Sequence, residues 1–438
     1  MAIHHGPHAR TMTRVRRHRL LALALAATAL PVLAPTPAAA APPAGACQDA
    51  EPAHPVVAAL PWAQQLLDPD RVWPESRGAG VLVAVVDSGV DTDHPQLRRP
   101  GKVLPGKDFY TPGGEPATFD CESHGTEVAS IVAADPVSGV GFHGVAPDAR
   151  ILPVRVTNRE LNDQGQTLQI DPQEIANGIR YAVDQGAGVI NLSLAGTTDF
   201  PAVRDAVGYA VSRNVVVVAA AGNQQQNDTT ELPSYPAGYP GVLGVGAVDI
   251  NGARASTSQF GPYVSIVAPG AGVLAATRVA GQSYVDGTSF ATAFVSGAAA
   301  LVRAAWPQLS AAQVIQRLEA TASPARGGRD SAEYGAGVVD PYRAVTDQLD
   351  PRAPADLPAY VPKPPDQAEL ARLAEQRHVD TVATWLAAGA LGVLLLAAAA
   401  AVVLRRARRR HWRPAQAARL PAEPEIVEPP EQIFLLDR

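Results

Sequence analysis

The sequence predicts an α/β fold: a doubly wound, mostly parallel sheet with helices on both faces, followed by one C-terminal transmembrane helix. Between residue 78 and about residue 344, short apolar runs alternate with segments of helical periodicity. Strands that alternate with helices indicate parallel βαβ units. Near the C-terminus, residues 382–404 form an uncharged apolar run that is long enough to cross a bilayer.

Five apolar runs are predicted as strands of the sheet. Residues 81–86 are a continuous run of Val, Leu and Ala, as expected for a strand that is buried on both faces. Similar runs cover residues 151–156, 189–194, 215–220 and 242–248.

Helices are predicted between these strands and after the last of them. The helical segments are residues 126–134, 172–185, 201–213, 289–306 and 310–321. Asp171 before Pro172 predicts an N-cap followed by proline at the first helical position. The segment that starts at Ser289 is rich in small and apolar residues, which suits a central, buried helix, whereas Ser310 caps an amphipathic one.

The two ends of the chain predict targeting and anchoring. Arginines precede an uncharged run at residues 20–30 and small residues follow, which is typical of a cleaved leader covering residues 1–40. A retained anchor is the alternative. Five arginines follow the apolar run and hold the tail, residues 405–438, in the cytoplasm, with everything before residue 381 outside the cytoplasmic membrane. A buried core helix is the alternative for residues 381–404.

Proline content and charge add two expectations. The proline-rich residues 349–380 predict a stiff linker between the domain at residues 76–348 and the membrane. A net charge of −6 gives no sign of a nucleic-acid partner.

The two cysteines, Cys47 and Cys121, both lie on the predicted exported side. An oxidising compartment favours a disulfide between them, which would tether the N-terminal extension, residues 41–75, close to His124. Two unpaired buried thiols are the alternative.

Three short peptides supply an acid, a base and a nucleophile: Asp87-Ser88-Gly89, His124-Gly125-Thr126 and Gly287-Thr288-Ser289. Asp87 directly follows the first predicted strand, so it lies at the sheet edge where ligands bind in open α/β folds. Ser289 opens a helix, and the backbone N–H groups there can stabilise an oxyanion. Each peptide alone also fits a plainer reading, as a turn acid, a loop histidine and a helix cap.

Asn223 is a fourth candidate. It follows a predicted strand and a glycine, which suits a second oxyanion donor or, alternatively, a turn residue.

These peptides resemble, in order and spacing, the signature segments of the subtilisin-like serine proteases. The similarity covers roughly residues 76–346 and includes residues 334–340, which are similar to the closing segment of that family. The resemblance implies that Ser289 is the nucleophile, His124 the general base and Asp87 its orienting acid. Asn223 and the Ser289 N–H would hold the oxyanion. The segment expected to bind the substrate backbone comprises Ser193, Leu194, Ala195 and Gly196, and the pocket before the scissile bond is expected to be lined by Ala220 and Gly222.

The sequence departs from that family in three places. Glu127 stands where relatives often carry a second histidine. Residues 41–80 show no compact pattern of the usual folding pro-domain, so this segment is expected to wrap the catalytic domain. Residues 134–144, where many relatives bind calcium, offer Asp135 and little else, so neither a metal nor a cofactor is predicted.

The order of segments narrows the resemblance to the mycosins, the membrane-anchored subtilases of type VII secretion systems. The implied role is cleavage of exported proteins outside the cytoplasmic membrane, with protein or peptide substrates, the membrane and the secretion membrane complex as partners. A subunit that stabilises that complex without proteolysis, and a generic membrane-tethered housekeeping protease, are the alternatives.

Overall fold

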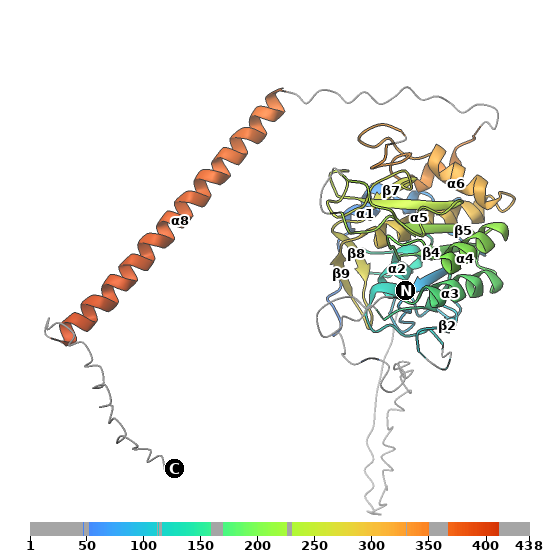
Figure 1. The fold of residues 1–438 in the computed structure, drawn as a ribbon, viewed down its shortest axis with the longest axis horizontal. Coiled ribbons are helices and arrows are strands. Elements are labelled where there is room, and N and C mark those ends of the chain that lie inside the picture. Colours follow the sequence, from blue (N-terminus) through green and yellow to red (C-terminus); the bar gives the residue numbers. More distant parts are fainter. Residues whose placement is uncertain are drawn as a thin grey trace, which may run out of the picture. The chain divides into compact units, whose positions relative to one another are not determined.

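The computed structural model describes residues 47, 52–111, 113, 116–158, 170–225, 230–329, 331–349 and 367–410. They belong to two units divided between Val361 and Pro362. The first unit contains the sheets, and the described part of the second is one long helix (Figure 1). The predicted leader, the proline-rich residues 351–366 and the tail from residue 411 lie outside the described residues.

Seven strands form the central sheet of the first unit, in the order β2-β3-β1-β4-β5-β6-β7. Every neighbouring pair is parallel, so the predicted sheet is confirmed. Its strands are β1 Leu82–Asp87, β2 Lys107–Asp108, β3 Arg150–Arg155, β4 Val189–Leu192, β5 Val216–Ala220, β6 Val242–Val248 and β7 Ile266–Pro269. The strand order reverses at β1, which is the place where ligands bind in doubly wound folds.

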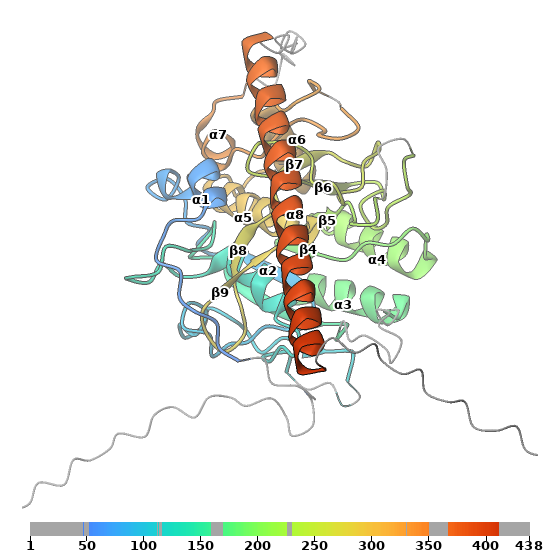
Figure 2. The same ribbon diagram turned by 90° about the vertical axis from the view of Figure 1, so that its left-hand side faces the viewer.

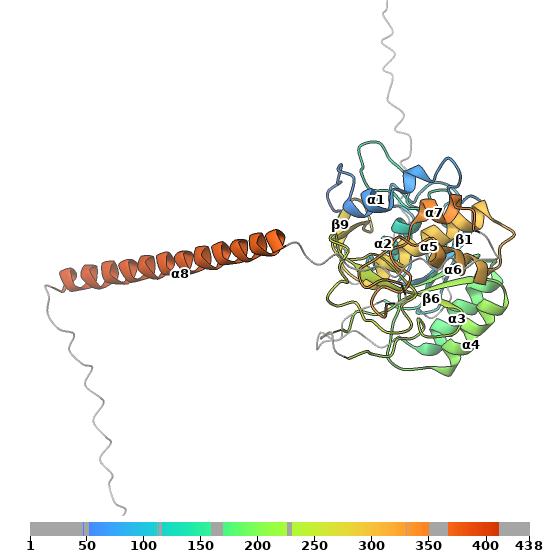
Figure 3. The same ribbon diagram turned by 90° about the horizontal axis from the view of Figure 1, so that it is seen from above.

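Alternate side chains of the strands enter two separate cores. Val83 and Val85 of β1 pack in the core that is shared by α2 (His124–Ala133) and α5 (Thr288–Ala305). Leu82 and Ala84 pack in the other core, with α3 (Pro172–Asp184) and α4 (Pro201–Ser212). Figure 3 shows α3 and α4 side by side. Helices therefore cover both faces of the sheet, as the alternation of the sequence predicts.

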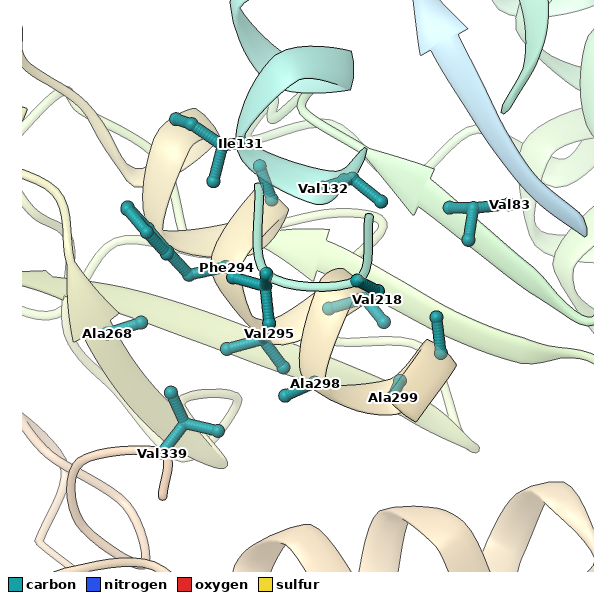
Figure 4. Packing of buried hydrophobic residues seen from close by; sticks show 14 of the residues in the cluster. Val83, Ile131, Val132, Val218, Ala268, Phe294, Val295, Ala298, Ala299 and Val339 are labelled. Carbon is teal, nitrogen blue, oxygen red and sulfur yellow. The ribbon is translucent and has the colours of Figure 1, made fainter. Parts of the chain in front are cut away.

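Helix α5 runs through the first of these cores, as predicted for the helix that follows Ser289. Figure 4 shows Phe294, Val295 and Ala298 of this helix among side chains of α2 and the sheet, such as Ile131 and Val218. Small residues let the helix approach its neighbours closely. It is followed by α6 (Ala311–Ala320), which Ser310 starts with a capping box, and by α7 (Pro341–Thr346).

A hairpin and the N-terminal extension complete the first unit. The hairpin pairs β8 (Val273–Ala276) with antiparallel β9 (Gln282–Val285) and leads into α5. The His54 N–H donates to the Ala280 carbonyl (2.9 Å), so the extension lies along the hairpin. It continues through α1 (Trp62–Leu67) and η1 (Pro69–Arg71), and Figure 2 shows α1 and the hairpin on the same side of the unit. The described part of the extension thus wraps the domain, as expected.

The second unit contains α8, Gln367–Arg409. Within it, Thr381–Arg409 is long and apolar enough to cross a membrane. The helix begins well before the predicted end of the linker at residue 380. The last proline before the helix is Pro365. The residues that follow it include Gln, Ala, Glu, Leu and Arg, which are good helix formers. Among the described residues, α5 also passes the same length and composition test, but 83% of it is buried, so it is a core helix.

Candidate active site

Asp87 is the last residue of β1 and is fully buried at the carboxyl edge of the sheet. Its Oδ1 accepts hydrogen bonds from the backbone N–H of Ser88 (2.8 Å) and from Nδ1 of His124 (2.7 Å). A proton on Nδ1 leaves Nε2 as the basic nitrogen of the ring. The aspartate therefore fixes both the tautomer and the direction of the imidazole.

His124 is the first residue of α2, two residues earlier than the predicted helix start. It is 8% exposed, and Ser123 before it adopts a left-handed conformation (φ 62°) that turns the chain into the helix. The ring lies 5.4 Å, between centroids, from the ring of Phe290. The imidazole of His124 thus contacts the residue that follows Ser289.

Ser289 is the second residue of α5 and is 4% exposed. Gly287 is the N-cap, with a positive φ of 150°, so the chain enters the helix in a conformation that favours glycine. The Ser289 hydroxyl lies 3.3 Å from the carbonyl oxygen of Ser193. At this position the backbone N–H has no partner within the helix and points out of its positive end.

Asn223 lies just beyond β5, beside the start of α5. Its Oδ1 accepts from the Thr288 N–H (2.9 Å) and the Thr288 hydroxyl (3.0 Å). Because the oxygen is held by these donors, the amide Nδ2 is directed away from Thr288. A Cβ on Gly287 would lie 3.1 Å from that nitrogen. The amide of Asn223 therefore lies against Gly287 and Thr288, the two residues that precede Ser289.

The four residues expected to bind a substrate strand differ in accessibility. Ser193 and Leu194 are buried, and the Ser193 hydroxyl donates to the Ser289 carbonyl (2.9 Å). Gly196 exchanges two backbone hydrogen bonds with Tyr235, of 2.9 and 2.8 Å, so its N–H and C=O are taken. Ala195 is exposed, and among the described residues it has no backbone hydrogen bond. Of the four residues, Ala195 is therefore the one that is exposed and whose backbone groups are without a backbone partner among the described residues.

Ala220 and Gly222, which are expected to line the pocket, lie on β5 and on the loop after it. Ala220 is the last residue of β5 and is buried. Gly222 faces Ala195: a Cβ on Gly222 would lie 3.3 Å from the Ala195 Cβ and 2.1 Å from Oε1 of Gln259. The positive φ of 102° at this position favours glycine.

Two buried charged residues beside Asp87 were not predicted. Arg155, on the neighbouring strand, donates from Nε to the Ser88 carbonyl (3.1 Å) and pairs with Asp108 (2.7 Å). Asp120 accepts from the Ser88 hydroxyl (3.0 Å). Neither residue belongs to a short motif, and their position depends on pairing between distant segments. A buried-strand pattern that contains one arginine was the only local signal for Arg155.

The extension is covalently attached close to this site. Cys47 and Cys121 form a disulfide across a sequence separation of 74 residues, as the sequence favoured. Cys121 is three residues from His124. The bridge therefore fixes the first described residue of the extension to the loop that leads into α2.

Asp135, the acidic residue of the segment 134–144, pairs with two cationic side chains. Asp135 accepts from Arg99 (2.9 Å) and lies 2.8 Å from Nζ of the buried Lys102. Burial lowers the pKa of Lys102, whereas its hydrogen bond to Asp135 raises it. In the part of the chain that the structure describes, no cluster of three or more His, Cys, Asp or Glu side chains has the geometry of a metal site.

Comparison with known proteins gives one consistent family. The model described as "Subtilase family", peptidase S8, matches residues 78–337. A thermophilic serine proteinase of Bacillus sp. (strain AK1) is 40% identical over 278 residues; the match covers 63% of this chain but only 65% of that protein's length. Mycosin-4 of Mycobacterium tuberculosis (strain ATCC 25618 / H37Rv) is 37% identical over 340 residues, covering 68% of this chain and 73% of that protein.

A solved structure has the same fold. The crystallised serine protease MycP1, described as an essential component of the type VII (ESX-1) secretion system, superimposes with a TM-score of 0.57 at 35% identity. The match covers 67% of this chain and 91% of the solved one.

Proposed function

The chain belongs to the Subtilase family, and from that premise we propose that it is a serine endopeptidase with Ser289, His124 and Asp87 as its catalytic residues. His124 Nε2 removes the hydroxyl proton as Ser289 Oγ attacks the carbonyl carbon of a peptide bond. The imidazolium then gives that proton to the leaving amine, and water hydrolyses the acyl-enzyme by the same steps in reverse. Asp87 keeps the ring oriented and stabilises its charge throughout.

The observation that carries this proposal is the 2.7 Å hydrogen bond from His124 Nδ1 to the buried Asp87. A buried carboxylate on Nδ1 orients the ring and stabilises the imidazolium that forms when the other ring nitrogen acts as a base. The oxyanion that forms during attack would accept from the Ser289 N–H and from Nδ2 of Asn223. Both donors are already oriented, which is what lowers the energy of a developing charge.

The proposed substrate is an extended peptide. Ala195 offers free backbone groups to a strand that adds to this edge, as in other cases of strand addition. The side chain before the scissile bond would then lie between Ala195 and the segment that includes Ala220 and Gly222.

For its cellular place, we propose a single-pass protein of the cytoplasmic membrane that cleaves exported proteins of a type VII secretion system. The candidate span at Thr381–Arg409 ends in an arginine block, which favours a cytoplasmic tail and a catalytic domain outside. The mycosin and MycP1 similarity supports the link to secretion. That MycP1 is called an essential component of its system also favours a second role, as a structural subunit of the complex.

The direct test is to label the full-length protein in membranes with a fluorophosphonate, which reacts with activated serines. We expect one labelled residue, Ser289, and loss of both labelling and peptide hydrolysis in Ser289→Ala. Ser212→Ala, on the exposed surface of α4, is the matched control and should behave as the wild type. Undiminished hydrolysis by folded Ser289→Ala protein would refute the catalytic assignment. Secretion that survives Ser289→Ala but fails on deletion of the gene would identify the structural role.

A further inference from the structure

The first turn of α2 is capped by side chains from outside the helix. Ser123 is the N-cap residue, but its hydroxyl accepts from the N–H of Arg278 (3.0 Å) instead of from the helix. The N–H of Gly125 donates to the Ser88 hydroxyl (2.9 Å), and the N–H of Thr126 donates to Asp120 Oδ2 (2.8 Å). The helix that carries the base is thus capped by the turn after Asp87 and by Asp120.

Asp120 is the centre of this arrangement. It is 3% exposed, and its carboxylate accepts four hydrogen bonds. Oδ1 accepts from the Ser88 hydroxyl (3.0 Å) and the Glu122 N–H (3.0 Å). Oδ2 accepts from the N–H (2.8 Å) and the hydroxyl (2.7 Å) of Thr126. All four partners are donors, so the group fits its surroundings as a carboxylate that uses both oxygens.

Among the described residues, no cationic side chain pairs with the Asp120 carboxylate. Burial raises the pKa of Asp120, and the negative charge of Asp87 adds to that rise, whereas the hydrogen bonds from Thr126 and Glu122 lower it. The guanidinium of Arg278 donates to the backbone carbonyl of Asp120 (3.2 Å). The carboxylate of Asp120 thus lies near a second buried acid, Asp87. Its hydrogen bonds connect the turn after Asp87 to the first turn of α2.

We propose that Asp120 is a positioning residue that sets the distance and direction of His124 relative to Asp87. One oxygen holds the turn that starts at Asp87, through the Ser88 hydroxyl, and the other holds the helix turn that starts at His124, through Thr126. The two segments lie 37 residues apart in sequence, and this single carboxylate spans them. The inference rests on the proposed function, because the distance matters only if His124 acts as a base.

The alternative is that Asp120 only caps α2. A carboxylate that only caps a helix would accept the same kind of hydrogen bonds but would have no effect on catalysis. Asp340 provides the comparison. It caps α7 by accepting from the Arg343 N–H (3.0 Å) and also accepts from the Ser323 hydroxyl (3.0 Å), far along the chain from the catalytic motifs. Asp120→Asn and Asp340→Asn both turn an acceptor-only carboxylate into an amide. In Asp120→Asn the amide nitrogen would face a backbone N–H in either orientation, because each Asp120 oxygen accepts from one. In Asp340→Asn it can donate to the Ser323 hydroxyl, so Asp120→Asn should lose more stability.

The activity of the full-length protein separates the two explanations. For Asp120→Asn we expect kcat to fall by about 10²-fold with KM changed less than about twofold, because displacement of a catalytic group affects the reaction and not substrate binding. Asp340→Asn should keep the wild-type kcat. Ser88→Ala removes only the bridging hydroxyl and should reduce kcat by about tenfold; it replaces Asp120→Asn if that variant does not fold. An unchanged kcat in Asp120→Asn, or in Ser88→Ala if Asp120→Asn does not fold, would overturn the proposal.

A second readout does not depend on activity. In Ser289→Ala protein labelled with ¹⁵N-histidine, the Nδ1 proton of His124 should give a low-field resonance that is protected from exchange by Asp87. Adding Asp120→Asn should broaden or remove this resonance, while adding Asp340→Asn should leave it in place. If the resonance persists unchanged with Asp120→Asn, the positioning role is refuted whether or not the wild type hydrolyses peptides. An inactive wild type that still shows the expected loss would instead refute the proposed function alone.

Discussion

A Cβ on Gly125 would lie 2.1 Å from the carbonyl oxygen of Gly89, so the two glycines bring the acid and base motifs into backbone contact. Gly89 itself has a positive φ of 107°, and a side chain on it would lie 2.0 Å from the Phe119 carbonyl oxygen. Gly125 is therefore required by the approach of one motif to the other, and Gly89 by its positive φ and by the Phe119 carbonyl.

Replacing Gly125 by alanine should separate the two motifs. The new methyl group meets backbone, which cannot rotate away, so we expect the free energy of unfolding to fall by about 1–3 kcal/mol and kcat to fall by about 10²-fold. Gly208→Ala is the control: Gly208 is an exposed residue of α4 with nothing within 4 Å of its added Cβ. That change should stabilise the protein by about 0.5–1 kcal/mol and leave kcat unaltered. Denaturant unfolding and peptide hydrolysis measure both quantities.

The hydroxyl of Thr288 should matter for the oxyanion donors. It donates to Asn223 Oδ1 (3.0 Å) and accepts from the Gly222 N–H (3.1 Å). Thr288→Val keeps the shape but removes both hydrogen bonds, so the amide of Asn223 is held only by the Thr288 N–H. We expect kcat to fall by about tenfold, the equivalent of one hydrogen bond of about 1.4 kcal/mol.

Thr292→Val is the matched control for that change. Thr292 is equally buried one turn later on α5, and its hydroxyl donates to the Thr288 carbonyl (2.7 Å). A similar loss of kcat in both variants would mean that the helix, and not the orientation of Asn223, is responsible.

The sequence predicted the parts of the site that depend on local pattern. Asp87 follows a fully apolar strand and Ser289 starts a long helix, so topology alone places both at the same edge of the sheet. Asp120 could not be predicted, because its role depends on a contact with the Ser88 hydroxyl, which precedes it by 32 positions. The pairing of the Gly196 backbone with Tyr235 in an isolated bridge could not be predicted either, because no periodicity in the sequence indicates it. The start of α8 at Gln367 was missed because the prolines before it dominated the composition of that stretch.

The disulfide should stabilise the fold more than it affects the reaction. It closes a loop of 74 residues, for which the chain-entropy argument gives roughly 4 kcal/mol. We expect the double variant Cys47→Ser/Cys121→Ser to unfold at a lower temperature than the wild type. Reduction of the wild-type protein should lower its unfolding temperature by as many degrees as the double substitution does. Equal stability with and without the bridge would show that backbone contacts such as that of His54 with Ala280 hold the extension equally well.

The methyl group of Ala195 should limit the side chain that precedes the scissile bond. It lies 3.3 Å from the position that a Cβ on Gly222 would occupy, so it narrows the space between the two proposed walls of the pocket. Peptide p-nitroanilides that differ only in this residue provide the measurement. The wild type should prefer alanine to phenylalanine at this position. Ala195→Gly should raise kcat/KM for the phenylalanine substrate relative to the alanine one by about tenfold, the effect of one methyl group in a pocket.

Thr197→Gly controls for loosening of this loop, since Thr197 is exposed and lies two residues further on. It should leave the ratio of the two kcat/KM values unchanged. A wild-type preference for phenylalanine would mean that residues other than Ala195 limit the size of the pocket. A ratio of kcat/KM values that Ala195→Gly does not alter would mean the same. In that case the peptide does not pass between Ala195 and Gly222, and the proposed strand addition at this edge has to be revised.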